Sequence, residues 1–216
     1  SLENIAHDIR TPVTRLMGTA ELALDSKYDP ESSKEALDEC IKESQQIITI
    51  LNALMEISAA ESGAIELKIE KTNLSTLLKE VVDLYDFIAE DKNITINTNL
   101  PDVLTTGIDI NKMRQALSNL VDNSIKYTPQ GGRVEIEAYE RANEVCVKIS
   151  DTGVGVDPED INRIWERLYR GDKSRSEKGL GLGLSIVKPI IEAHKGYIEV
   201  SSEPGKGSIF TIHLPR

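Results

Sequence analysis

The feature that most constrains the fold is a long helical repeat over residues 31–62. Apolar side chains recur there every seven residues, as at Ile41, Ile48 and Met55. Such a seam is typical of helices that pack in bundles. Residues 2–25 carry a second apolar stripe of helical spacing, and the connector between the two segments is short and turn-like. The two helices are therefore expected to return antiparallel, as a hairpin.

A two-helix hairpin on its own buries too little apolar surface to be stable, because so small a unit has almost no interior. The simplest remedy is a second copy of the same hairpin. We therefore expect a homodimer in which the two hairpins form a four-helix bundle with two-fold symmetry.

The helical pattern stops at Ser62-Gly63, and alternation of apolar and polar residues predicts a strand at 65–69. Further strands are predicted at 93–99, 133–140, 144–150, 196–202 and 208–214, and helices at 74–90, 109–127 and 185–194. Pro189 should end or kink the last of these helices, since it lacks a backbone donor. The chain is thus predicted to be α+β, with a helical hairpin followed by an α/β sandwich.

Composition excludes some classes of function. The 216 residues carry 25 basic and 36 acidic side chains, and a net charge of −11 argues against a nucleic-acid-binding surface. The two cysteines, Cys40 and Cys146, lie in apolar stretches and are predicted to be buried thiols in a reducing compartment. No run of about 18 apolar residues is present, so no membrane-spanning helix is expected.

Four short segments carry the chemistry. Two are rich in glycine, at 151–155 (DTGVG) and 179–183 (GLGLG), and basic residues lie between them. Glycine allows the backbone to approach a ligand closely, and N–H groups beside cations favour phosphate. The other two segments are His7-Asp8-Ile9-Arg10-Thr11-Pro12 and residues 119–127 (NLVDNSIKY).

In their order along the chain, the four segments resemble the motifs of sensor histidine kinases of two-component systems. Residues 7–12 resemble the phosphoacceptor box, 119–127 the N box, 151–155 the G1 box and 179–183 the G2 box. The resemblance implies a dimerisation and histidine phosphoacceptor domain at 1–64 and a GHKL-type (Bergerat) ATP-binding catalytic domain at 65–216. It also implies a homodimeric protein-histidine kinase that uses ATP and Mg²⁺ and acts on a response regulator receiver domain.

The predicted nucleophile is His7, because a neutral imidazole can attack with one nitrogen while the other keeps its proton. Asp8 could accept a hydrogen bond from Nδ1–H and leave Nε2 free. The resemblance assigns Asp8 this role, although the commoner residue there is Glu. Thr11, four residues after His7, shares its helical face. By resemblance, Thr11 would position a water molecule that hydrolyses the phosphorylated regulator.

The remaining predicted site residues would bind the nucleotide. Asn123 could hold Mg²⁺ through its amide oxygen, which is the role the resemblance gives it, and Asn119 lies one turn earlier on the same face. Lys126 could reach phosphate and Tyr127 could pack on adenine. By resemblance, Asp151 accepts a hydrogen bond from the adenine amine. The predicted loop and lid positions are Gly153, Gly155, Arg167, Gly179, Gly181 and Gly183. No G-x-x-x-x-G-K-[ST] motif is present, so the site is not a P-loop.

Structural interpretations compete with several of these assignments. Asn119 and Tyr127 could belong to an ordinary polar helix face, and Arg167 to a solvated basic loop. His194, at a helix end, and His213, on a terminal strand, are expected to be structural. The segment Trp165-Glu166-Arg167-Leu168 departs from the family's F-E-x-F box, with Trp165 and Leu168 in place of the two phenylalanines.

The leading hypothesis is autophosphorylation of His7 followed by transfer to an aspartate of a response regulator, with phosphatase activity toward the phospho-regulator. The alternative is a non-catalytic, nucleotide-binding dimeric scaffold that gates a partner; the altered lid and Asp8 motivate it. An ATP-driven chaperone or mismatch-repair relative would have no need of the hairpin. We expect the chain to be a cytoplasmic domain of a cell-membrane sensor protein, with its sensing and membrane segments upstream.

Overall fold

The computed structural model describes residues 2–24, 30–61, 66–166, 169 and 183–216. The chain separates into two compact units, Ser1–Ser58 and Ala59–Arg216. Within the described residues, none of the helices combines the length and apolar character needed to cross a bilayer.

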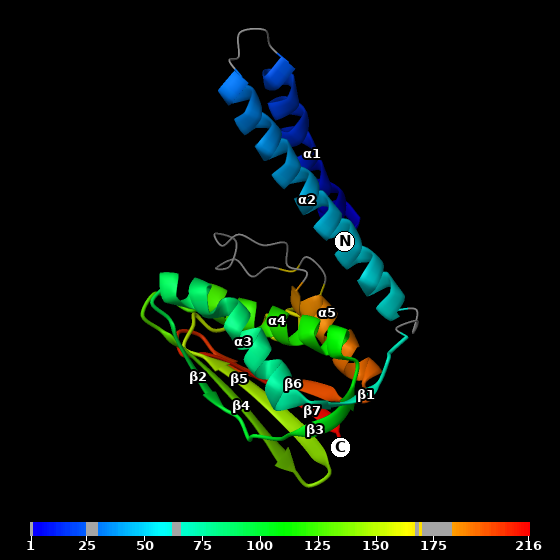
Figure 1. Ribbon diagram of the computed structural model, residues 1–216, viewed down its shortest axis with the longest axis vertical. Coiled ribbons are helices and arrows are strands. Elements are labelled where there is room, and N and C mark those ends of the chain that lie inside the picture. Colours follow the sequence, from blue (N-terminus) through cyan, green and yellow to red (C-terminus); the bar gives the residue numbers. More distant parts are fainter. Residues whose placement is uncertain (1, 25–29, 62–65, 167–168, 170–182) are drawn as a thin grey trace. The chain divides into compact units, whose positions relative to one another are not determined.

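The first unit is a pair of helices, α1 (Leu2–Leu24) and α2 (Pro30–Glu61). Residues of the second half of α1 face the first half of α2: the Cys40 thiol lies 3.6 Å from the carbonyl oxygen of Leu16, and Arg15 pairs with Glu43 at 3.7 Å. The two helices run antiparallel, as predicted (Figure 1). α1 continues through Pro12.

Large apolar side chains of the hairpin remain exposed in the single chain. On α2 the heptad residues are among them, with Ile41 55%, Ile48 56% and Met55 71% accessible. On α1, Met17 and Leu22 are also more than half exposed. The heptad repeat therefore forms a stripe that the hairpin alone does not bury.

The second unit is built on a five-stranded sheet in the order β2-β4-β5-β7-β6. Its strands are β2 (Thr95–Asn99), β4 (Arg133–Arg141), β5 (Glu144–Asp151), β6 (Tyr197–Glu203) and β7 (Gly207–Pro215). β2 pairs parallel with β4, and all other pairs in this sheet are antiparallel. A separate two-stranded antiparallel sheet joins β1 (Glu70–Asn73) to β3 (Thr105–Ile108).

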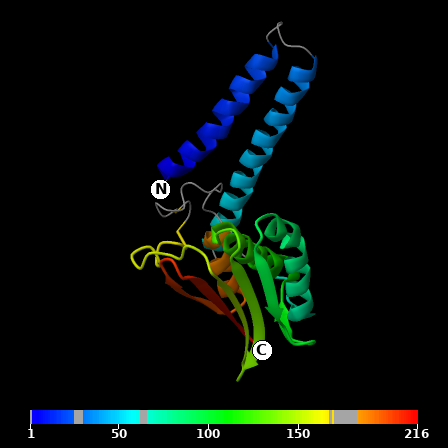
Figure 2. The same cartoon turned by 90° about the vertical axis from the view of Figure 1, so that its left-hand side faces the viewer.

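Three helices cover one face of the large sheet: α3 (Leu74–Asp91), α4 (Ile110–Tyr127) and α5 (Gly183–Ala193). Figure 1 shows the helices as one layer and the sheet as the other, and Figure 2 shows the same two layers turned by 90°. The core lies between them and consists of aliphatic side chains, such as Leu117, Leu120, Ile149 and Ile212, that are fully buried. The predicted architecture of a helical hairpin and an α/β sandwich is confirmed.

The helix starts are fixed by side chains that the sequence places just before them. Asn73 accepts a hydrogen bond from the Ser75 amide at the start of α3, and Asp109 accepts one from the Lys112 amide at the start of α4. Such N-caps satisfy amide groups that have no partner within the helix.

The strand predicted at 65–69 is wrong. Its described residues, 66–69, form no strand, and β1 begins at Glu70. The reason is that the Lys68 amide donates to a carboxylate oxygen of Asp109, at 2.8 Å, instead of to a neighbouring strand. The four-residue strand β3 had no counterpart in the sequence prediction.

Expectations for four single residues can also be compared with the structure. Pro189 does not end α5, which continues to Ala193. Cys146 is fully buried, as predicted, whereas Cys40 is only half-buried. His194 is structural, but it serves as a neutral ring: Nδ1 lies 2.7 Å from the Ile190 carbonyl, and Nε2 accepts the Asp109 amide at 3.0 Å.

Candidate functional site

Two asparagines of α4 face the first residue of α5. A Cβ added at Gly183 would lie 3.3 Å from Oδ1 of Asn119 and 3.7 Å from Nδ2 of Asn123. Both asparagine side chains are half-buried. Gly183 therefore allows the backbone of the α5 N-terminus to approach both amides, whose one-turn spacing places them on one side of α4. The structure brings these three predicted residues together.

The C-terminal end of α4 carries Lys126 and Tyr127. The Lys126 ammonium lies 5.1 Å from the centre of the Tyr127 ring, within range of a cation–π interaction. The end of the helix is fixed by Lys92, whose ammonium group donates to the carbonyl oxygens of Ile125 (3.2 Å) and Lys126 (2.9 Å). A cation at this position satisfies the last carbonyls and complements the helix dipole.

Asp151 is the last residue of β5 and is partly buried. Its Oδ1 accepts the amide of Gly153 at 2.8 Å and that of Ser208, on β7, at 3.2 Å. Oδ2 accepts no hydrogen bond within the described part of the chain. Burial raises the pKa of this carboxyl group, although the two backbone amides act in the opposite direction. Asp151 is thus held rigidly by one oxygen and presents the other.

The loop after Asp151 requires glycine at two positions. A Cβ on Gly153 would lie 2.6 Å from Oδ1 of Asp151 and 2.7 Å from the carbonyl of Tyr127. Gly155 has φ +68° and faces the carbonyl of Glu203, which a Cβ would approach to 2.2 Å. The amide of Val154 donates to the carbonyl of Tyr127 at 3.1 Å. The loop is therefore attached to the end of α4, so the two predicted segments are neighbours.

Beyond this loop, Trp165 packs edge-on against Phe210 of β7, with 6.1 Å between ring centres. Trp165 therefore anchors the described part of this segment to the sheet, although it differs from the expected phenylalanine. Arg167, Gly179 and Gly181, which were predicted to bind phosphate or form the lid, lie outside the described residues.

The predicted phosphoacceptor segment lies in α1. His7 and Asp8 are helical in their backbone, and their side chains lie outside the described set. Thr11 follows one turn later, with an exposed side chain. In the unit that contains it, the segment is part of a continuous helix.

Sequence reasoning missed three residues that build the site. Ser208 donates its amide to Asp151. Gly207 has φ +104°, and a Cβ there would lie 1.9 Å from the Asp151 carbonyl. Lys92 caps α4 from a different helix–strand connection. The Gly-Lys-Gly at 205–207 signals a turn between two strands, but nothing local indicates that this turn would reach Asp151.

The donor set is suited to a nucleoside triphosphate with a magnesium ion. The free carboxylate oxygen of Asp151 can accept from an exocyclic amine, which adenine has and guanine lacks at the corresponding position. Asn119 and Asn123 offer amide oxygens, ligands that Mg²⁺ takes while it keeps several waters. The first turn of α5, which begins at Gly183, has backbone N–H groups of the kind that bind phosphate.

Comparison with known families identifies both units. Residues 108–216 match the family described as histidine kinase-, DNA gyrase B- and HSP90-like ATPase. Residues 1–63 match the His Kinase A (phospho-acceptor) domain.

Individual proteins agree with these matches. Sensor protein SrrB of Staphylococcus aureus strain N315 is 33% identical over 218 residues, which cover 100% of this chain and 37% of that protein. The histidine kinase AdeS of Acinetobacter baumannii superposes with a TM-score of 0.77 at 26% identity, covering 97% of each chain. The histidine kinase ThkA, in a complex with response regulator protein TrrA, gives 0.77 at 25% identity and covers 99% of this chain and 60% of its own.

Proposed function

The chain belongs to the sensor histidine kinases, and on this premise we propose that it phosphorylates itself on His7 with ATP and passes the phosphoryl group to an aspartate of a response regulator. One observation carries the proposal: a phospho-acceptor domain that contains His7 shares the chain with a histidine kinase-like ATPase domain, in which two backbone amides bind Oδ1 of Asp151.

Nucleotide recognition rests on Asp151. Its Oδ1 is occupied by two backbone amides, so Oδ2 is the oxygen that accepts from the adenine amine. We place the Tyr127 ring beside the base; the backbone of this residue lies next to the loop that follows Asp151, since its carbonyl accepts the Val154 amide. Asn123 would hold Mg²⁺ through its amide oxygen, and Asn119 lies one turn earlier on the same side of α4. Magnesium would neutralise charge on the phosphate oxygens of the triphosphate.

The phosphate tail extends toward the start of α5. The first turn of α5, from Gly183 on, supplies backbone N–H groups there, and Lys126 supplies a positive charge. We include Arg167, Gly179 and Gly181 in this part of the site as the lid that closes over the triphosphate. Such a lid would exclude water and place the γ-phosphoryl group for transfer rather than hydrolysis.

Transfer to His7 needs a neutral imidazole with a free nitrogen. Asp8 accepts a hydrogen bond from Nδ1–H of His7 and so fixes the tautomer in which Nε2 carries the free lone pair. The Nε2–P bond forms as the bond from phosphorus to the ADP oxygen breaks, and ADP leaves with that electron pair. The positive charge on the product ring is stabilised by Asp8. In the second step, a carboxylate oxygen of the regulator's aspartate attacks phosphorus and His7 leaves neutral.

Thr11 lies one turn beyond His7, where its hydroxyl group can position a water molecule toward the phosphorylated aspartate of the regulator. We propose that the same helix face thereby also removes phosphate from the regulator. The histidine kinase ThkA, which shares this fold, forms a complex with response regulator protein TrrA. That complex supports a receiver domain as the partner of the hairpin.

The assembly that we propose is a homodimer through the hairpin. The exposed heptad stripe of α2 is the surface that a second hairpin would cover to complete a four-helix bundle. The domain boundary we propose, between residues 64 and 65, lies close to the end of α2 at Glu61. The chain spans 37% of the length of the curated sensor proteins it matches, and we propose that it is the cytoplasmic kinase part of a membrane-attached sensor.

The test is phosphorylation with ATP labelled on its γ-phosphate, in the presence of Mg²⁺. We expect label that is lost in acid and stable in base, as a phosphoramidate is, and no label in the His7→Ala variant. Nucleotide binding by that variant should be unchanged, since His7 lies in the other unit. If the protein binds ATP and takes up no label, the scaffold function replaces the kinase function.

A further inference from the structure

A second group of chemically active side chains lies on the face of the sheet turned away from the helices. Cys146 of β5 is paired in register with His213 of β7, which is paired with Tyr197 of β6. Their neighbours Val145, Val147, Ile212 and Leu214 are buried against the helices, so strand alternation would leave Cys146 and His213 exposed. Both are nevertheless buried, at 0% and 4% accessible.

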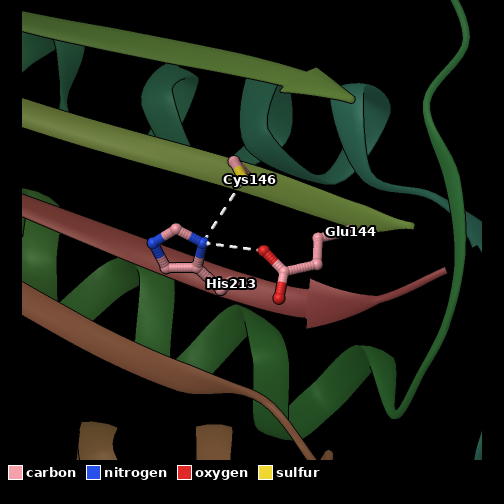
Figure 3. A group of neighbouring side chains, drawn as sticks. All are labelled: Glu144, Cys146 and His213. Atoms are coloured by element: carbon pink, nitrogen blue, oxygen red, sulfur yellow. Dashed lines mark hydrogen bonds and ion pairs between the residues drawn. The ribbon is translucent and has the colours of Figure 1, made fainter. Parts of the chain in front are cut away.

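The group consists of three potential metal ligands: the thiol of Cys146 and the carboxylate of Glu144 both lie next to one ring nitrogen of His213. Nδ1 of His213 lies 3.5 Å from Sγ of Cys146 and 3.2 Å from Oε2 of Glu144. All three ligand atoms lie within 4.8 Å of one another. Figure 3 shows both contacts converging on the same nitrogen, with Cys146 and Glu144 approaching from β5 and the ring from β7.

We propose that Glu144, Cys146 and His213 bind one Zn²⁺ ion. In tetrahedral coordination with Zn–S, Zn–N and Zn–O bonds of ordinary length, the sulfur–nitrogen edge is about 3.6 Å and the nitrogen–oxygen edge about 3.4 Å. The distances in this protein, 3.5 and 3.2 Å, are close to both edges. The two distances that involve the imidazole are therefore close to those of a zinc site, and the sulfur and carboxylate oxygen lie within 4.8 Å of each other.

A second acidic residue, Glu199, lies beside the other ring nitrogen, at ion-pair distance but without a hydrogen bond to it. Oε2 of Glu199 lies 3.3 Å from Nε2 of His213, on the opposite side of the ring from the ligand cluster. A carboxylate at that position favours the proton on Nε2 and leaves the Nδ1 lone pair for a metal. The ring is also stacked on Tyr197, with 4.2 Å between centres and 3° between planes. Its orientation is thus set before any metal binds.

Binding has a defined proton balance. Zinc binds the thiolate form of cysteine, so the Cys146 thiol loses its proton to the solvent as the Zn–S bond forms. Access is from the side of Glu144, whose side chain is 38% exposed. Water can enter from that side as the fourth ligand.

The ligand chemistry separates this ion from the magnesium of the nucleotide. Thiolate and imidazole select zinc and similar transition metals, whereas Mg²⁺ prefers oxygen ligands. The position is separate as well: Cys146 and Asp151 lie five residues apart on β5, about 17 Å in an extended strand. Nucleotide binding can therefore report on folding while zinc binding is tested.

The test measures the Kd for Zn²⁺. The metal-free 216-residue protein is titrated with Zn²⁺ in competition with a chromophoric chelator, with Mg²⁺ in excess. We expect one Zn²⁺ per chain, and Co²⁺ in its place should show a thiolate-to-metal charge-transfer band. Cys146→Ser and Glu144→Gln should each raise the Kd for Zn²⁺ by more than about 100-fold. Glu199→Gln, which alters only the orienting carboxylate, should raise it about 10–100-fold.

Two matched variants serve as controls. Cys40→Ser removes the other thiol, and Glu137→Gln removes a carboxylate of the same sheet face that pairs with Lys148 at 2.8 Å; both should bind zinc as the parent does. ATP binding verifies that each ligand variant is folded. The proposal is overturned if the parent takes up no zinc, as an imidazolium held between Glu144 and Glu199 would imply. It is equally overturned if folded Glu144→Gln and Cys146→Ser retain the parent affinity.

Discussion

Replacing Asp151 by asparagine tests the nucleotide site most directly. The substitution preserves shape, and Oδ1 of the new side chain can still accept the amides of Gly153 and Ser208. The Nδ2 group then occupies the position of Oδ2, the oxygen that we assign to the adenine amine. The Nδ2 group and the adenine amine are both donors, so the hydrogen bond that the carboxylate oxygen Oδ2 would accept from the amine cannot form.

The magnitude follows from that single contact. A hydrogen bond to a charged group contributes about 1.5–3 kcal/mol, which corresponds to about a 10- to 150-fold increase in the Kd for ATP. GTP should respond in the opposite direction, because its 6-oxo group accepts from the new amide. The preference for ATP over GTP should therefore decrease by more than the loss of ATP affinity alone.

The same substitution should stabilise the nucleotide-free protein at neutral pH. Burial raises the pKa of Asp151, so its favourable contribution to stability is fully present below the unfolded pKa. That contribution is lost as pH rises through the folded pKa. Above that range the parent carries a poorly solvated carboxylate that Asp151→Asn lacks. The difference in Tm between variant and parent should decrease as pH is lowered through this window.

Calorimetric titration with both nucleotides and thermal unfolding across pH provide the measurements. Asp102→Asn, an exposed aspartate in a loop before β3, is the control and should change neither quantity. Unchanged ATP affinity in Asp151→Asn would refute the adenine contact. A lower Tm at neutral pH would refute the account of its burial.

Three further predictions concern stability and assembly. Gly155→Ala should lower the free energy of unfolding by more than Gly205→Ala. Both glycines have positive φ, a conformation that costs alanine about 1–2 kcal/mol, but only at Gly155 would the new Cβ lie 2.2 Å from a carbonyl oxygen. Equal losses by chemical denaturation would contradict this. His194→Phe should cost about 1–3 kcal/mol, since it leaves the buried Asp109 amide without its acceptor; an unchanged denaturation midpoint would refute the assignment. Ile41→Glu, on the exposed stripe of α2, should yield monomers in sedimentation analysis, and an intact dimer would exclude that stripe as the interface.

Much of the fold was predictable because its signals are local. The heptad spacing of α2 and the alternation in β4, β5 and β7 are visible in short windows, and these elements were placed to within a few residues. The strand predicted at 65–69 failed for a non-local reason. Its Lys68 amide is taken by Asp109, which lies 41 residues later. The strand β3 is only four residues long and contains Gly107, so its pattern is too short to detect.

The candidate site likewise combines residues that local motifs indicate with residues that only a distant contact brings in. The motifs indicated Asn119, Asn123 and Asp151 as candidates, because each belongs to a contiguous segment of recognisable composition. They did not identify Ser208, which contributes only a backbone amide from 57 residues away. Every residue except proline has a backbone N–H group, so the residue type at position 208 does not indicate that its amide binds Asp151.

The sequence by itself determined most of the helices and strands and indicated the candidate site residues, because periodicity and motif spacing are properties of neighbouring residues. Only the tertiary structure decided which of these residues meet. The register of β5 against β7 pairs Cys146 with His213, and the same alignment brings the Ser208 amide to Asp151. A shift of one residue would turn every side chain of one strand to the opposite face. Both the nucleotide contact and the proposed zinc site therefore depend on a pairing between strands that lie far apart in the chain.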